Sequence, residues 1–262
     1  MIREGMVTTM DRDSKSYNVR AVERAMQILC SFQGQHATMG VSEVAQATGL
    51  HKATAHRILT TLVSTGFLER TSDGDRFRLG LRLMELGLGA LRSLDFRRAA
   101  VPYMQQLVER FQESCTLSIW DRGQMLYVEV VYSEHDLTIG ARVGRHLPVH
   151  CTASGKVLLA FLPPKVTEPI LCGPLAAYTE KTITSPDRLR EELKLVRDRG
   201  YATAHQEFEM GIGAISVPIR NIDGKEVAAM SVAFPTSRLK AERVPEIAHA
   251  LLEAANAISA HA

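Results

Sequence analysis

Apolar and polar positions repeat with helical spacing in three segments near the start of the chain. Residues 18–33 carry this pattern and predict an amphipathic helix that ends near Gly34. Residues 41–50 predict a short helix, which Ser42 caps at its start and Gly49 ends. Residues 51–65 place apolar side chains on one face and small, polar and basic side chains on another. The last two helices predict a helix-turn-helix, whose second helix fits the major groove of DNA.

A hairpin follows these helices. Residues 67–70 and 76–79 alternate like paired strands on either side of a loop of turn residues. The hairpin is the wing of a winged helix-turn-helix, which we place at residues 17–80. The plain alternative is a packing module or a unit that contacts protein. The candidates for base or phosphate contacts are Ser42, Lys52, Ala53, Thr54, Arg57, Thr60 and Thr61, and for phosphate contacts from the wing Arg76 and Arg78.

The segment after the wing is rich in leucine and poor in charge. It predicts a linker helix at residues 81–95, with a further amphipathic helix beginning at 96. Exposed contiguous leucines are costly, so this helix packs either on its own chain or on a second copy. A protein that reads a two-fold symmetric operator needs a dimer, and we therefore expect a homodimer or tetramer.

The remainder of the chain, residues 96–262, mixes strand-like and helical patterns. Together they predict an α+β domain with helices packed on an antiparallel sheet. A hairpin turn is expected at 221–225. The predicted strands are 116–121, 125–131, 137–143, 214–220 and 226–234, and the predicted helices are 154–162, 185–200 and 244–258.

Composition is that of an ordinary globular protein. The 262 residues suit two domains, and 45% of them are hydrophobic. The longest wholly apolar stretch, 157–162, is far too short to span a membrane. Residues 1–16 are polar and charged without an apolar segment, so we expect a disordered lead-in and a cytoplasmic protein. Four cysteines without a CxxC pair predict reduced thiols, no structural metal and no cofactor.

Charge is distributed unevenly along the chain. Residues 1–98 hold 14 Lys and Arg against 10 Asp and Glu, whereas the rest of the chain holds 17 against 19. The surplus near the start is compatible with a phosphate backbone as partner, but it is too small to establish one. The prediction of DNA binding therefore rests on the pattern of the helices and the hairpin.

Small residues lead into the helix predicted at 154–162. The first N–H groups of a helix have no partner within it and attract anions, so a carboxylate fits at Thr152, Ala153, Ser154 and Gly155. A nucleotide-binding P-loop is excluded, because the residue five positions before this glycine is a histidine and Val157 stands where Ser or Thr is needed. The simpler alternative is that Thr152 or Ser154 only caps the helix.

An enzyme is the alternative from another functional class. Cys151 stands at a helix start and could serve a hydrolase as nucleophile, with His150 or His205 as base. Adjacent residues of an extended chain point to opposite sides, so His150 is badly placed for this role. A metal site that includes His146 lacks a firm fourth ligand. We therefore expect no enzyme and no metal, and we keep a domain that binds a protein partner as a further alternative.

Several motifs resemble those of the IclR family of bacterial transcriptional regulators. In the first 70 residues they are VERA at 22–25, SEVA at 42–45, KATAHRIL at 52–59 and LVSTGFL at 62–68. Later they are the segment 150–160 and the run from Gly200 to Glu207 with Gly211, Ile215 and Pro218. The resemblance covers nearly the whole chain from about Tyr17. It implies operator binding controlled by a ligand, dimers or tetramers, and a GAF/profilin-like domain whose sheet encloses the effector pocket.

The resemblance also suggests the chemistry of the effector. Polar ligand contacts of a carboxylate-sensing member of the family align with Ala204, Ala214, Ser231 and Ala233, of which only the serine can form a side-chain hydrogen bond. A roomier and more apolar wall favours a larger ligand that buries carbon. We expect an aromatic or hydrophobic carboxylate held by Ser231 and by the amides of residues 153–155. Trp120, Met125 and Tyr127 are further lining candidates outside this set.

Overall fold

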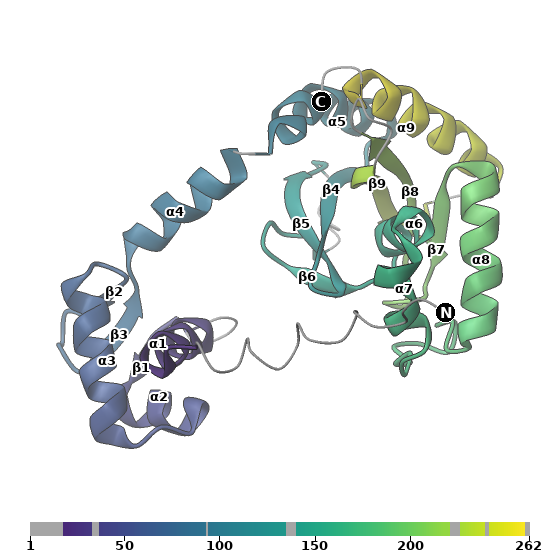
Figure 1. Ribbon diagram of the computed structural model, residues 1–262. Helices are drawn as coiled ribbons and strands as arrows, with labels where there is room; N and C mark the ends of the chain where they lie inside the picture. The colour runs from purple at the N-terminus through teal and green to yellow at the C-terminus, as the bar shows by residue number, and fades with distance from the viewer. Residues whose placement is uncertain are drawn as a thin grey trace, which may run out of the picture. The chain divides into compact units, whose positions relative to one another are not determined.

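The computed structural model describes residues 18–32, 37–92, 94–134, 140–220, 226–238 and 241–259. The chain divides into two compact units between Ala90 and Leu91 (Figure 1). The expected lead-in at 1–16, the helix end near Gly34 and the hairpin turn at 221–225 lie outside the described residues.

The first unit is a three-helix bundle with a small antiparallel sheet in the order β1-β3-β2. Its buried residues come from all three helices and from the hairpin, so a single apolar core holds the unit together. This confirms the predicted winged helix-turn-helix. The elements are α1 (Arg20–Ser31), β1 (Met39–Gly40), α2 (Val41–Thr48), α3 (Lys52–Ser64), β2 (Leu68–Arg70) and β3 (Arg76–Leu79).

The start of α2 differs from the prediction that Ser42 caps it. Gly40 is the N-cap residue, and its backbone N–H donates to Oε2 of Glu43 at 2.7 Å. The cap lies earlier because β1 pairs with β3 and leads directly into the helix, which leaves Ser42 within the first turn. The predicted end is correct: Gly49 has φ of +67°, a backbone conformation that glycine adopts without strain.

The helix α4 (Leu81–Arg92) spans the division between the two units. Leu83 packs on the core of the first unit, and Leu91 packs on the core of the second. Leu81, Met84 and Leu88 are exposed in this single chain, at 70%, 61% and 42% of their full area. The linker helix is thus present, but most of its apolar side chains find no cover within the described chain.

The second unit has a six-stranded antiparallel sheet in the order β6-β5-β4-β9-β8-β7. It confirms the predicted α+β class. The elements are α5 (Asp95–Phe111), β4 (Ser114–Asp121), β5 (Gln124–Val131), β6 (His146–Pro148), α6 (Ala153–Phe161), α7 (Pro164–Leu171), α8 (Pro186–Arg199), β7 (Ala202–His205), β8 (Ile212–Arg220), β9 (Glu226–Pro235), a 3₁₀ turn (Ala241–Arg243) and α9 (Val244–Ser259).

One predicted strand is misplaced. Of residues 137–143, only 140–143 are described, and none of those four is in a strand. The chain turns there, with the N–H of Arg145 donating to the carbonyl of Arg142 and Gly144 at φ of +85°. The edge strand β6 begins only after this turn, at His146.

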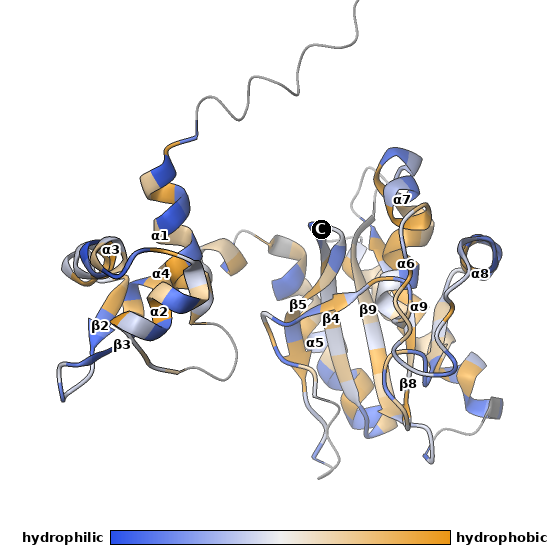
Figure 2. Ribbon diagram, turned by 90° about the horizontal axis from the view of Figure 1, so that it is seen from below, coloured by the Kyte–Doolittle hydropathy of each residue, from blue (hydrophilic) through white to orange (hydrophobic). Residues whose placement is uncertain are grey.

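Helices cover both faces of the sheet. One face packs on α5 and α9, and the other packs on α6, outside which α7 and α8 lie (Figures 1 and 2). Side chains alternate between the two faces, so Cys115 and Leu117 of β4 join the core under α5 and α9, while Thr116 turns toward α6. Figure 2 shows hydrophobic residues, in orange, along strands of the sheet.

Over the described ranges, no helix has both the length and the apolar composition needed to cross a membrane. In the same ranges no three His, Cys, Asp or Glu side chains come together as ligands for a metal ion.

Candidate functional site

The helix α3 presents a polar face that nothing in its own unit covers. Ala55, Leu59 and Leu62 are buried, so they fix which face packs on the core. Thr60 and Thr61 donate their hydroxyls to the helix carbonyls four residues earlier, at 2.9 and 3.0 Å. The remaining predicted contact residues of this helix are Lys52, Ala53 and Arg57, which are exposed, and Thr54, which is half-buried.

A groove between α1 and α3 adds two basic residues that the sequence analysis did not select. Arg20 and Arg24 of α1 line it together with Arg57 of α3, and Thr54 and Thr61 contribute its polar wall. Three guanidinium groups beside the exposed face of α3 suit a phosphate backbone. Their signal in the sequence was weak because charged residues occupy the outer face of almost any amphipathic helix.

The two arginines of the wing have carboxylate partners within the protein. Arg76 pairs with Glu43 at 2.7 Å and donates to the carbonyl of Thr38 at 3.0 Å, so it ties β3 to the start of α2. Arg78 pairs with Glu69 at 2.8 Å. Both arginine side chains remain about half exposed, at 41% and 58%. Phosphate contacts by these residues remain a prediction, and each contact has to compete with an existing ion pair.

A pocket in the second unit lies between the sheet and α6. Seven of the eight residues that the sequence analysis proposed for the effector line it, although they come from separate parts of the chain. They are Thr152, Ala153, Ser154, Ala204, Ala214, Ser231 and Ala233. Met125 and Tyr127 line it as well, whereas Trp120 does not.

Gly155 is the exception, and it has a structural reason. A Cβ atom there would lie 2.3 Å from the Cα and the carbonyl oxygen of Val149. The glycine therefore lets the first turn of α6 approach the preceding chain closely. Its N–H is also occupied, because it donates to Oγ1 of Thr152 at 3.2 Å.

The floor of the pocket is built from directly paired residues of neighbouring strands. Ala204, Ala214 and Ala233 face one another in register across β7, β8 and β9. Two positions along, Ser231 pairs with Ser216 and with Thr116. The first row ends at Cβ atoms and is apolar, and the second row carries hydroxyls.

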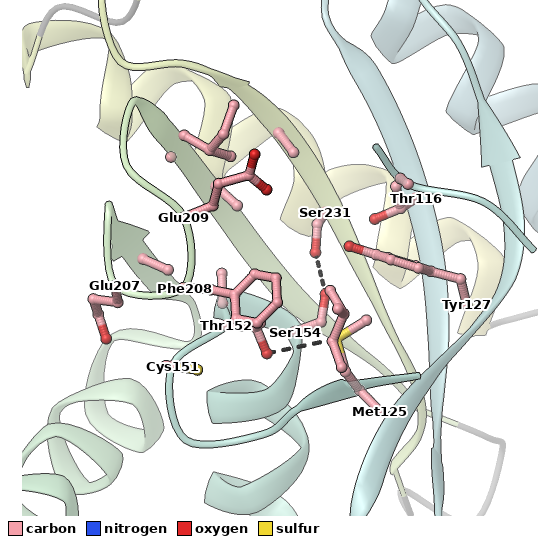
Figure 3. A pocket seen from close by; sticks show the side chains of 18 of the residues that line it. Thr116, Met125, Tyr127, Cys151, Thr152, Ser154, Glu207, Phe208, Glu209 and Ser231 are labelled. Carbon is pink, nitrogen blue, oxygen red and sulfur yellow. Dashed lines mark hydrogen bonds between the residues drawn. The ribbon is translucent and has the colours of Figure 1, made fainter. Parts of the chain in front are cut away.

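Polar groups collect where α6 begins. The hydroxyls of Ser154 and Ser231 share a hydrogen bond, and the hydroxyl of Tyr127 points toward the same part of the pocket (Figure 3). Burial raises the pKa of Tyr127 to about 12, so this residue is a neutral phenol at pH 7. Among the described residues, the backbone N–H groups of Ala153 and Ser154 have no acceptor. This end of the pocket therefore offers hydrogen-bond donors to a ligand.

A loop between β7 and β8 forms another wall of the pocket. Glu207, Phe208 and Glu209 line the cavity from this loop. Glu207 accepts two hydrogen bonds from Nζ of Lys156 at 2.8 and 3.1 Å, and that lysine side chain is only 1% exposed. Glu192 of α8 lies 3.6 Å from the same Nζ. The buried ion pairs thus fasten the loop to α6 and α8.

The geometry opposes the hydrolase alternative. Burial and, to a smaller extent, the charge of Glu207 raise the pKa of Cys151 to about 12. Nε2 of His150 is hydrogen-bonded to the carbonyl of Ala176 at 2.9 Å. No hydrogen bond joins Cys151 to a histidine in the part of the chain that is described. The thiol therefore lacks both a base and thiolate character.

Comparison with known protein families covers almost the whole chain. Residues 21–72 match the IclR helix-turn-helix domain, and residues 88–260 match the bacterial transcriptional regulator IclR C-terminal family.

Curated relatives include two regulators from Escherichia coli strain K12. The HTH-type transcriptional regulator KdgR is 34% identical over 95% of each chain. The HTH-type transcriptional regulator XynR is 32% identical over 92% of this chain and 96% of its own. These relatives are regulators of transcription rather than enzymes.

Among solved structures, an IclR homologue from Microbacterium hydrocarbonoxydans complexed with 4-hydroxybenzoate is similar throughout. It is 33% identical with a TM-score of 0.83, over 92% of this chain and 98% of its own.

Proposed function

Since the chain belongs to the IclR family of bacterial transcriptional regulators, we propose that it binds operator DNA as a homodimer or tetramer under the control of an aromatic or hydrophobic carboxylate. Residues 17–80 carry operator binding, residues 81–95 form the linker and residues 96–262 bind the effector. The protein works in the cytoplasm, where its operator lies.

The observation that carries the effector class is the row of three alanines on the pocket floor. Ala204, Ala214 and Ala233 offer a ligand no polar side chain, so the strands they occupy favour an apolar body. The hydroxyl of Ser231 and the free amides of Ala153 and Ser154 supply contacts for its polar groups. The 4-hydroxybenzoate bound by the Microbacterium homologue is a ligand of this class.

The effector acts by favouring one arrangement of the DNA-binding units over another. It changes operator affinity only as far as it binds the two arrangements with different affinity. Couplings of this kind are typically about 1–3 kcal/mol, or roughly 5- to 150-fold in affinity.

A thermal-shift series tests the effector class. We expect aromatic acids such as 4-hydroxybenzoate to raise the melting temperature, and glyoxylate and pyruvate to have no effect. A ligand at 100 times its Kd adds about 2.7 kcal/mol to the free energy of unfolding. The active acids are then added to an operator fragment selected from genomic DNA, whose affinity for the protein should change.

Ser231→Ala gives the variant for this series, and the exposed Ser237→Ala is its control. We expect Ser231→Ala to weaken binding of the acids by about fivefold, because a hydrogen bond is worth about 1 kcal/mol. Stabilisation by the small acids alone would show that the pocket is not built for an apolar body. Failure to select any operator fragment would contradict the proposed DNA binding.

A further inference from the structure

Arg145 lies at the edge of the pocket, in a position that its backbone fixes. Its carbonyl oxygen accepts a hydrogen bond from the N–H of Tyr127 at 3.1 Å, and the N–H of Gly144 donates to the carbonyl of Tyr127 at 2.9 Å. These bonds hold Arg145 opposite a pocket-lining residue of β5, just before β6 begins. Its side chain is part of the pocket wall.

The guanidinium group of Arg145 reaches across to the loop between β7 and β8. Its central carbon lies 6.0 Å from the ring centroid of Phe208, which belongs to that loop and also lines the pocket. Arg145 and Phe208 therefore come from opposite edges of the sheet and meet over the cavity.

Most hydrogen-bond donors of this guanidinium are unused. Arginine has five N–H donors in a planar fork. Nη1 of Arg145 donates to the carbonyl of Gly140, and across the described residues this is its one hydrogen bond. No carboxylate of those residues pairs with it. A partly buried cation without an anionic partner gains from binding one, and a carboxylate matches the fork with two parallel bonds.

The charges around the cavity leave this role to Arg145. Of the described residues that line the pocket, Arg145 is the one cation. Lys156 lies nearby, but it is taken up by Glu207 and Glu192. Glu207 is thereby neutralised, and Glu209 is exposed to solvent.

We propose that Arg145 binds the carboxylate of the effector, and that the Ser154–Ser231 pair with the neighbouring free amides binds a second polar group of the same molecule. The proposal rests on the proposed function, since it concerns the same pocket. It defines the ligand as an acid in its ionised form, with an apolar body between two polar ends. Neutral amides and esters of the same acids lack the charge that Arg145 requires.

The test is calorimetric titration of the full-length protein with benzoate, 4-hydroxybenzoate, phenylacetate and terephthalate, and with benzamide and 4-hydroxybenzamide. The variants are Arg145→Gln and Arg145→Lys. Arg142→Gln is the matched control, because Arg142 stands in the same turn with an exposed side chain outside the pocket wall. The unfolding midpoint of each variant without ligand is measured alongside, so that a folding defect is recognised.

We expect the acids to bind the wild type and Arg142→Gln alike, and the amides to bind far more weakly. Arg145→Gln should lower the affinity of the protein for the acids by roughly 10- to 100-fold, which is the range for losing a hydrogen bond to a charged group. The affinity of Arg145→Lys for the acids should lie between those of the wild type and Arg145→Gln, because an ammonium group keeps the charge but lacks the planar fork of donors. The affinity for the amides should change little in Arg145→Gln.

Three results would overturn the proposal, and they differ in what else they affect. Equal binding of the acids to the wild type and to Arg145→Gln, or equal binding of acid and amide to the wild type, removes the role of Arg145 and leaves the proposed function standing. Binding of no acid to the wild type removes the carboxylate class itself, and the role of Arg145 with it.

Discussion

Cys151 lies at the start of α6 with its side chain in the pocket wall (Figure 3), where a nucleophile would meet any bound ligand. Its position alone does not make Cys151 a nucleophile. Burial raises the pKa of the Cys151 thiol to about 12, so it stays in its neutral form at pH 8. The residue therefore contributes to the pocket as a small, apolar group.

Alkylation with iodoacetamide at pH 8 tests this view of Cys151. We expect the exposed Cys30 and Cys172 to be labelled first, and Cys151 and the fully buried Cys115 to stay unlabelled until the protein is denatured. Peptide mass spectrometry identifies the modified positions, and the double variant Cys30→Ser/Cys172→Ser removes the fast reaction as a control. Fast labelling of Cys151 in the native protein would restore the case for an activated thiol.

The residues of the pocket could be predicted only in part. The small residues at 152–154 stood out as a helix start, and the resemblance supplied Ala204, Ala214 and Ser231. Lys156 gave no signal as the buried partner of Glu207, because the two are 51 positions apart and charged residues in a sequence usually face solvent. Arg145 was missed for the same reason.

At the scale of elements, α3 is the part of the first unit that reads DNA in the proposed function. Its neighbour α1 adds Arg20 and Arg24 to the same groove. A side chain that contacts a base edge and one that contacts only phosphate have different effects when they are removed. Removing a base contact changes which DNA sequences the protein prefers. Removing a phosphate contact weakens binding to all sequences and makes the affinity less dependent on salt.

Arg57→Ala tests the placement of α3. We expect a loss of about 1–3 kcal/mol in operator affinity at physiological salt, because Arg57 is exposed beside the groove on the face away from the core. Fluorescence anisotropy with a selected operator fragment measures it. The control is Arg188→Ala, an exposed arginine of α8 in the other unit. Unchanged affinity of Arg57→Ala would show that another surface reads the DNA.

Long elements could be predicted from periodicity, and among the short strands β2 and β3 could be predicted because a loop of turn residues joins them. The helices α3, α8 and α9 extend over 13 or more residues each, so their apolar positions repeat several times. The strands β1, β6 and β7 have two to four residues, which is too few to show an alternation. The strand predicted at 137–143 is absent over its described residues, 140–143, because its sequence alternates while its chain turns at Arg142 to Arg145.

At the scale of the whole molecule, the apolar side chains of α4 determine the proposed assembly. Leu81, Met84 and Leu88 recur at helical spacing and are exposed in the single chain. Contiguous apolar surface of this kind marks an interface. Two DNA-binding units joined through it would suit the two halves of a palindromic operator.

The double variant Leu81→Glu/Met84→Glu tests the assembly. We expect it to be a monomer by analytical ultracentrifugation, because charge on this face opposes burial against a second copy. Operator affinity should fall with it, while aromatic acids still bind to the pocket. Ala90→Glu, on the opposite face of the same helix, is the control. A double variant that stays oligomeric would place the interface elsewhere.

The row of Ala204, Ala214 and Ala233 makes this sensor easy to retune. Each position lies on a different strand and ends at a Cβ atom, so a larger or polar side chain changes the cavity while the backbone ladder between the strands stays intact. Substituting three codons in combination, coupled to a reporter gene, would yield a biosensor library in which specificity changes and the scaffold does not.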